Sequence, residues 1–173
     1  VSKGLVEMEN CAMNGDLTCF NCEEATALSL SWIGGAVTTK KRFLTVDGSS
    51  VSSVKSVDLQ LYLRDATFMC NKGFARLADA PGQDDIPQMR VLAEHCRFVI
   101  SESSVLLEQV GVAEPEAYQE AVHWSDHLGK YEGGRIFRKI DGAGDPIEID
   151  YSSAGQPMEY QGISGIQGFL PTN

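Results

Sequence analysis

Two histidines spaced four residues apart are the residues whose types and spacing most directly suggest chemistry. His123 and His127 lie in the segment AVHWSDHLGK, residues 121–130. If the segment is helical, this spacing places both imidazoles on one face, and Glu120 falls on the same ridge. Imidazole and carboxylate groups arranged in this way can share a zinc ion. His123, His127 and Glu120 therefore form a candidate metal site, and with it a metal-dependent enzyme.

The same residues have a simpler interpretation as the solvated face of a helix. Glu–His pairs three or four residues apart contribute a few tenths of a kcal/mol each on such a face. The HExxH pattern of metalloproteases requires a glutamate directly after the first histidine. Trp124 occupies that position, so this enzyme class is excluded.

The cysteines are a second candidate metal site. Cys11, Cys19 and Cys22 cluster near the start of the chain, and the last two form a CxxC. A structural zinc site normally uses a second such pair, whereas only the isolated Cys70 and Cys96 remain. The three thiols with one distant ligand could complete a zinc site, and the alternative is that they are small buried residues.

Other catalytic and nucleotide-binding motifs are absent from the sequence. It contains no GxSxG elbow, no GxxxxGK[ST] loop and no GxGxxG stretch. DGAGD (141–145) lacks the spaced oxygen ligands of a calcium loop and is typical of a hairpin turn.

Charge and composition limit the partners. The 173 residues contain 24 acidic and 14 basic side chains, a net charge of −10. The densest basic run is only Lys40, Lys41 and Arg42, which argues against nucleic acid and against an anionic membrane surface. Because no stretch has the ~20 apolar residues that span a bilayer, and five cysteines suggest reduced thiols, we expect a cytoplasmic protein. A processed exported chain remains the alternative.

The first part of the chain and its last regular elements have the pattern of strands. Apolar and polar residues alternate in 27–32 and 54–63, and 36–46 is rich in β-branched and aromatic residues. RIFRKI and PIEIDY, joined by DGAGD, predict a hairpin over 135–151. The polar outer faces suggest an antiparallel sheet of about five or six strands.

The middle of the chain has the pattern of helices. Residues 65–80 are compatible with a short helix, and apolar residues from Met89 to Val110 recur at steps of three and four. A second helix is predicted to begin near Pro115 and to end at Gly129. Two helices with so short a link would form an antiparallel hairpin. No internal repeat is apparent.

The last 22 residues, 152–173, predict an extended arm. Glycine and proline deny them a regular element, yet a disordered tail would hold fewer large apolar side chains. We expect the arm to pack on its own core or on a neighbouring subunit. Its predicted contact residues are Met158, Tyr160, Ile163, Ile166, Phe169 and Leu170.

Together these patterns predict an α+β fold in which residues 1–151 form one domain, with a helical hairpin on an antiparallel sheet and the arm at 152–173. The predicted function is a non-catalytic interaction or assembly protein that binds a protein partner or itself, such as a subunit of a symmetric or viral-type assembly, or an acidic protein of the binding or immunity type. No cofactor is expected for this function. The alternative is a metal-dependent enzyme built on His123, His127 and Glu120, with His95 as a further candidate ligand and zinc as the candidate cofactor.

Overall fold

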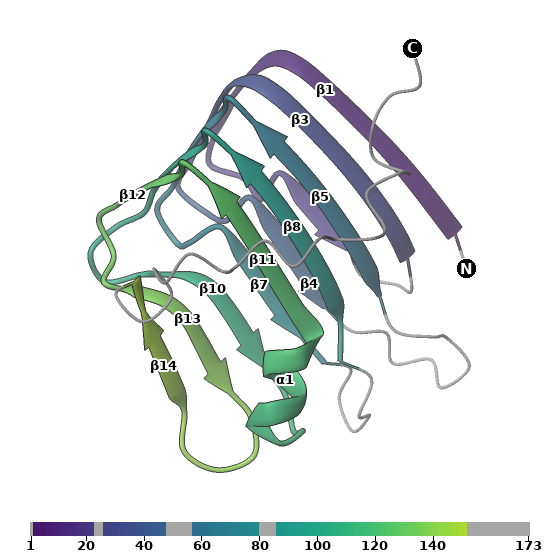
Figure 1. The fold of residues 1–173 in the computed structure, drawn as a ribbon, viewed down its shortest axis with the longest axis vertical. Helices are drawn as coiled ribbons and strands as arrows, with labels where there is room; N and C mark the ends of the chain where they lie inside the picture. The colour runs from purple at the N-terminus through teal and green to yellow at the C-terminus, as the bar shows by residue number, and fades with distance from the viewer. Residues whose placement is uncertain (1, 23–25, 48–56, 80–85, 152–173) are drawn as a thin grey trace.

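In a computed structural model the chain folds as a parallel β-solenoid, in which each strand pairs with a strand one coil away (Figure 1). The structure describes residues 2–22, 26–47, 57–79 and 86–151. Within these ranges the strands form two sheets. The first sheet contains β1 (Ser2–Gly15), β3 (Thr26–Thr39), β5 (Asp58–Arg64), β6 (Thr67–Cys70), β8 (Gln88–Glu94), β9 (Arg97–Val99), β11 (Val122–His127) and β12 (Lys130–Glu132).

The second sheet completes each coil on the opposite side of the core. It contains β2 (Phe20–Cys22), β4 (Leu44–Asp47), β7 (Ala75–Ala78), β10 (Val105–Val110), β13 (Ile136–Asp141) and β14 (Ile147–Asp150). Pairing is parallel throughout the described strands except between β13 and β14, which form the predicted hairpin. The predicted hairpin over 135–151 is therefore confirmed.

Each coil bends the first sheet at one residue in the left-handed conformation. The bend residues, in register from coil to coil, have φ between 50° and 73°: Asn10, Gly34, Asp65, His95 and Leu128. The next residue of the second coil, Gly35, is also left-handed, and a Cβ there would lie 2.0 Å from the Cys11 carbonyl oxygen. Glycine, asparagine and aspartate tolerate this conformation best, which explains three of the five bend residues.

Stacked aromatic rings form the centre of the core. Phe68, Phe98 and Tyr131 occupy equivalent positions on three coils, with ring centroids 5.4 and 5.3 Å apart and nearly parallel planes. Phe43 and Phe74 form a second stacked pair, at 4.8 Å. Because parallel coils repeat every ~4.8 Å, identical ring types one coil apart stack without distorting the backbone.

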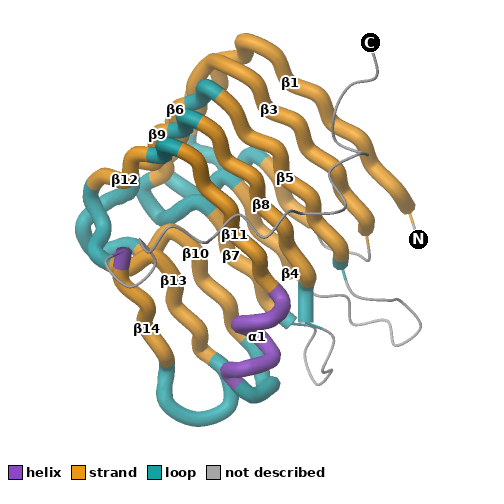
Figure 2. Tube along the Cα trace, in the orientation of Figure 1, coloured by secondary structure: helices purple, strands orange, loops and turns teal. Residues whose placement is uncertain are grey.

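A short helix, α1 (Pro115–Ala121), connects β10 to β11 (Figure 2). Tyr118 anchors it to the core. The Tyr118 hydroxyl donates to Asp79, and the Tyr118 carbonyl accepts hydrogen bonds from Gln109 and Arg138. No helix in the described part of the chain is long and apolar enough to cross a membrane.

The predicted α+β fold is wrong. The sheets are parallel where an antiparallel sheet was predicted, and no helical hairpin packs on them. Residues 65–80 contain β6 and β7, residues 89–110 contain β8, β9 and β10, and only 115–121 of the second predicted helix is helical. The strand predictions over 27–32, 36–46 and 54–63 overlap β3, β4 and β5. The arm, 152–173, lies outside the described residues.

The helical pattern from Met89 has a physical explanation. Met89, Val91 and Ala93 face inward at steps of two, and the bend at His95 then shifts the phase by one residue. The next inward side chain is Cys96, three positions after Ala93. Two short period-two runs joined by a step of three look like a helical stripe in sequence.

Candidate functional site

The N-terminal end of the solenoid carries a long strand edge. β1 runs for 14 residues and, among the described strands, pairs only with β3, from Ser2 opposite Thr26 to Gly15 opposite Thr39. Figure 1 shows β1 at one extreme of the stack of strands. The other edge of such a strand presents a row of backbone N–H and C=O groups that can pair with an added strand.

The side chains of this end layer are less buried than those one coil inside. Met8 and Met13 are only partly buried, whereas Trp32 and Val37, opposite them on β3, are completely buried. Leu5, on the outer face of β1, is 70% exposed. This end of the solenoid therefore exposes both apolar and acidic side chains beside an edge that no other described strand pairs with.

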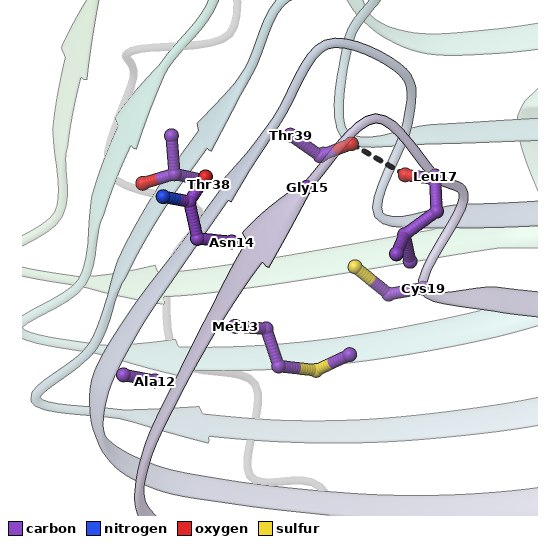
Figure 3. Close-up of a pocket in the computed structure, with 8 residues that line it drawn as sticks. All are labelled: Ala12, Met13, Asn14, Gly15, Leu17, Cys19, Thr38 and Thr39. Carbon is purple, nitrogen blue, oxygen red and sulfur yellow. Dashed lines mark hydrogen bonds between the residues drawn. The ribbon is translucent and has the colours of Figure 1, made fainter.

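A depression of about 280 Å³ opens beside the last residues of β1 (Figure 3). Its lining is Ala12, Met13, Asn14, Gly15, Leu17, Cys19, Thr38 and Thr39. The Thr39 hydroxyl donates to the Leu17 carbonyl and holds the turn after β1 against β3. None of these eight lining residues is charged, so the depression suits an apolar side chain and offers no acid–base pair.

The cysteine at this depression is poorly suited to be a nucleophile. Burial raises the pKa of the Cys19 thiol, and it also raises the pKa of the Cys22 thiol. Because the thiolate is the reactive form, both groups are less reactive than an exposed cysteine. Burial likewise raises the pKa of Cys70 to about 12, and the nearby Cys19 contributes to that shift.

The structure gives no support to the predicted cysteine zinc site. All five cysteines lie in the described ranges, and all are free thiols. Cys11 lies on β1, Cys19 in the following turn and Cys22 at the end of β2. In the described part of the chain, no three or more histidine, cysteine, aspartate or glutamate side chains are grouped so that they could hold a metal ion.

The helical geometry predicted for His123 and His127 is wrong. Both residues lie on β11, and only Glu120 lies on α1. Residues four apart on a strand are separated by ~13 Å, so the two imidazoles cannot share an ion. They share the outer face of the strand, because His123 and His127 are exposed whereas Val122 and Trp124, on the alternate positions, are buried.

The structure brings His127 next to His95, the further candidate ligand of the predicted metal-dependent enzyme, whereas His123 lies elsewhere on β11. The two ring centroids are 5.8 Å apart, and Asp65 Oδ1 lies 3.3 Å from His95 Nδ1. Asp65 and His95 are bend residues of consecutive coils. Bend residues of neighbouring coils are separated by 24, 31, 30 and 33 positions, and this approximate recurrence was the signal in the sequence that could have revealed the cluster.

The predicted contact residues of the arm all lie outside the described residues: Met158, Tyr160, Ile163, Ile166, Phe169 and Leu170. Their role remains a prediction.

Comparison with known proteins gives no family for this chain: no protein-family model, no curated protein and no solved structure matches it.

Proposed function

We propose that this chain is a non-catalytic assembly protein that pairs with a second copy of itself through the outer edge of β1. The observation that carries this proposal is the 14-residue edge, with no partner on its outer side among the described strands. Strand addition at such an edge forms backbone hydrogen bonds along its length, while side chains beside the edge provide specificity.

The two ends of the solenoid favour a closed dimer over a growing filament. The edges at the C-terminal end belong to the shorter strands β11, β12 and β14, of six, three and four residues. They carry many charged side chains, including Asp126, Lys130, Glu132 and Glu148. Short, charged edges resist strand addition, so the β1 edge of one copy is best matched by the β1 edge of another around a two-fold axis.

Leu5 is the residue through which this contact is best tested. It is 70% exposed on β1, and burying a leucine side chain contributes ~1.5–3 kcal/mol. Leu128 provides a matched control, because it is 68% exposed but lies at the bend between β11 and β12. A lysine at either position keeps the backbone unchanged, and at Leu5 it would place a charge in the contact.

The test is the mass of the full chain in solution, measured by light scattering over a range of concentrations. We expect a concentration-dependent dimer, which Leu5→Lys weakens on the order of tenfold or more and Leu128→Lys leaves within about twofold. A monomer at all concentrations, or equal loss in both variants, would contradict the proposal, as would polymers without a defined mass. Phe169→Lys in the full chain tests separately whether the predicted arm contributes to the same contact.

Salt separates this proposal from binding to a basic partner. Residues 1–25 contain five acidic side chains and one lysine, a net charge of −4. Two such ends repel each other, so dimerisation should strengthen between about 10 and 150 mM salt, as the screening length falls from ~30 to ~8 Å. Weakening with salt would instead favour an acidic surface that binds a basic protein.

A further inference from the structure

The second candidate site is the pair of imidazoles of His95 and His127, which lie on the outside of the bend, away from β1. His95 is the bend residue of the fourth coil, and His127 lies on the next coil, opposite Glu94 in the register. The His95 amide donates to the His127 carbonyl oxygen at 2.8 Å. Backbone pairing therefore fixes the two Cα positions relative to each other, and only side-chain rotation is needed to change the ring separation.

Asp65 orients one of these rings. Its Oδ1 lies 3.3 Å from His95 Nδ1, so the carboxylate favours a proton on Nδ1, which leaves the lone pair of the neutral imidazole on Nε2. Metal-binding histidines are commonly held in this way, with the second ring nitrogen donating to a carboxylate. The interaction selects the tautomer that binds a metal through Nε2.

The ring separation is close to that of two imidazoles on one ion. Two imidazoles bound to a metal at ~2.0–2.1 Å have centroids on the order of 5 Å apart. The centroids of His95 and His127 are 5.8 Å apart and their planes are inclined by 52°. The observed centroid separation therefore exceeds that value by less than about 1 Å, a difference that side-chain rotation can supply.

The charges around the pair favour a cation. Asp65 is in contact with His95, Glu94 is opposite His127, and Asp126 lies close enough to interact electrostatically with His127. A basic group, Arg64, pairs with one of these carboxylates, its Nε lying 3.6 Å from Asp65 Oδ2. Three carboxylates and one guanidinium give the patch a net negative charge while both imidazoles are neutral.

We propose that His95 and His127 together bind one divalent ion of the late transition metals, the class that prefers imidazole ligands and includes Ni²⁺, Cu²⁺ and Zn²⁺. Two nitrogens come from the protein, and water occupies the remaining positions. Such a site needs only two protein ligands, which agrees with the described residues containing no larger metal-binding group. Asp65 is a positioning residue that acts through His95.

The experiment is a titration of the full chain with Ni²⁺, followed by calorimetry and by NMR of the imidazole resonances. Ni²⁺ is chosen because it favours imidazole, which limits interference from the thiols. The chain has three histidines, so His123, on the same strand as His127, provides the matched control. The variants are His127→Gln, the control His123→Gln, and His95→Asn, in which asparagine tolerates the left-handed backbone.

We expect one ion per chain, with the resonances of His95 and His127 perturbed and those of His123 unchanged. His95→Asn and His127→Gln should each weaken binding at least about tenfold, and Asp65→Asn about tenfold, as for other carboxylates that orient a metal-bound histidine. His123→Gln should stay within about twofold. Absence of binding by the wild-type chain, or equal loss in the His123 and His127 variants, would overturn the proposal.

Circular dichroism of each variant checks that the solenoid is intact. Asp65→Asn has the additional value that asparagine keeps the bend and the size of the side chain but removes the charge. If metal affinity and the imidazole resonances of this variant were identical to those of the wild type, the orienting role of Asp65 would be wrong.

Discussion

The two ends of the solenoid differ in how far their outermost coils are buried. At the C-terminal end, β14 adds an antiparallel strand to β13, the edges belong to short strands, and α1 packs through Tyr118, which is 99% buried. At the N-terminal end, β1 has no equivalent cover among the described residues, and Met8 and Met13 remain partly exposed. The aromatic anchor of the C-terminal end is therefore more completely buried than the inward side chains of the N-terminal end.

If the proposed dimer forms, this difference combines stability at one end with association at the other. A solenoid buries each coil between two neighbours, so an end coil loses half of its contacts unless something covers it. At the C-terminal end, a buried hydrogen bond joins neighbouring coils: Arg138 Nε donates to Gln109 Oε1 at 2.6 Å. The other end keeps a strand edge and apolar side chains, which is what a partner of the same fold requires.

The largest expected effect comes from removing the buried ring that anchors α1. Tyr118→Ala should lower the free energy of unfolding by about 3–5 kcal/mol, because it removes a fully buried aromatic side chain. Met13→Ala, in the partly buried layer of the other end, should cost only about 1 kcal/mol. Urea denaturation at concentrations where the chain is monomeric measures both. Equal losses would contradict the contrast between the ends.

A smaller loss is expected from breaking the buried hydrogen-bond network. Gln109 and Arg138 are both buried, and burial lowers the pKa of Arg138 to about 10, so the guanidinium is still charged at neutral pH. Gln109→Leu leaves this buried cation without its side-chain acceptor and should cost about 2–3 kcal/mol. Gln60→Leu, on the outer face of β5, is the control and should change stability by less than about 0.5 kcal/mol. A similar cost in the two variants would show that the network is unimportant.

Alkaline pH should remove the contribution of the Tyr118 hydroxyl to stability. Burial, followed by the hydrogen bond to Asp79, raises the pKa of Tyr118 to about 12 from its usual 10. The folded state thus retains a proton that the unfolded chain loses, so this contribution to stability is intact below pH ~10 and is lost as pH rises toward ~12. Unfolding free energies measured across this range should fall less steeply for Tyr118→Phe. Identical slopes for the two proteins would refute this role of the hydroxyl.

The smallest expected effect on stability is at the exposed residue of the open end. Leu5→Lys should change the unfolding free energy of the monomer by less than about 0.5 kcal/mol, since the side chain is mostly in water. The same change should nevertheless weaken dimerisation. A monomer destabilised by more than ~1 kcal/mol would mean that Leu5 supports the fold itself.

The strands of this fold could be predicted from the sequence better than their arrangement. Leu59, Leu61 and Leu63 alternate with polar residues, and they form the inward face of β5 as predicted. The same alternation is compatible with parallel and antiparallel pairing, because the partner strands are set by long-range packing. A polar outer face was taken as a sign of an antiparallel sheet, whereas in a solenoid both sheets expose one face to solvent.

The repeat of the coil along the sequence was the signal that could have corrected the prediction of an antiparallel sheet. Inward side chains follow the same spacing in two stretches 30 residues apart: Leu59, Leu61, Leu63, Ala66, Phe68 and Cys70, then Met89, Val91, Ala93, Cys96, Phe98 and Ile100. The repeated step of three marks the bend. The two stretches share the spacing of their inward residues but few identical residues, so a search for sequence identity does not detect the repeat.

The candidate sites were predicted less well than the strands. Sequence spacing selected His123 and His127 as partners, but only a knowledge of coil register pairs His127 with His95. The importance of β1 depends on which strands lie beside it, and a local pattern contains no information about that. Both sites are products of stacking, which acts between residues about 30 positions apart.

Hydrogen exchange of the full chain, measured at low and at high protein concentration, tests the open end most directly. We predict that amides of residues 2–15 become more protected at high concentration, and that Leu5→Lys abolishes this change while residues 122–150 stay constant. Protection of residues 2–15 that is independent of concentration, or that increases only at residues 122–150, would contradict assembly through β1.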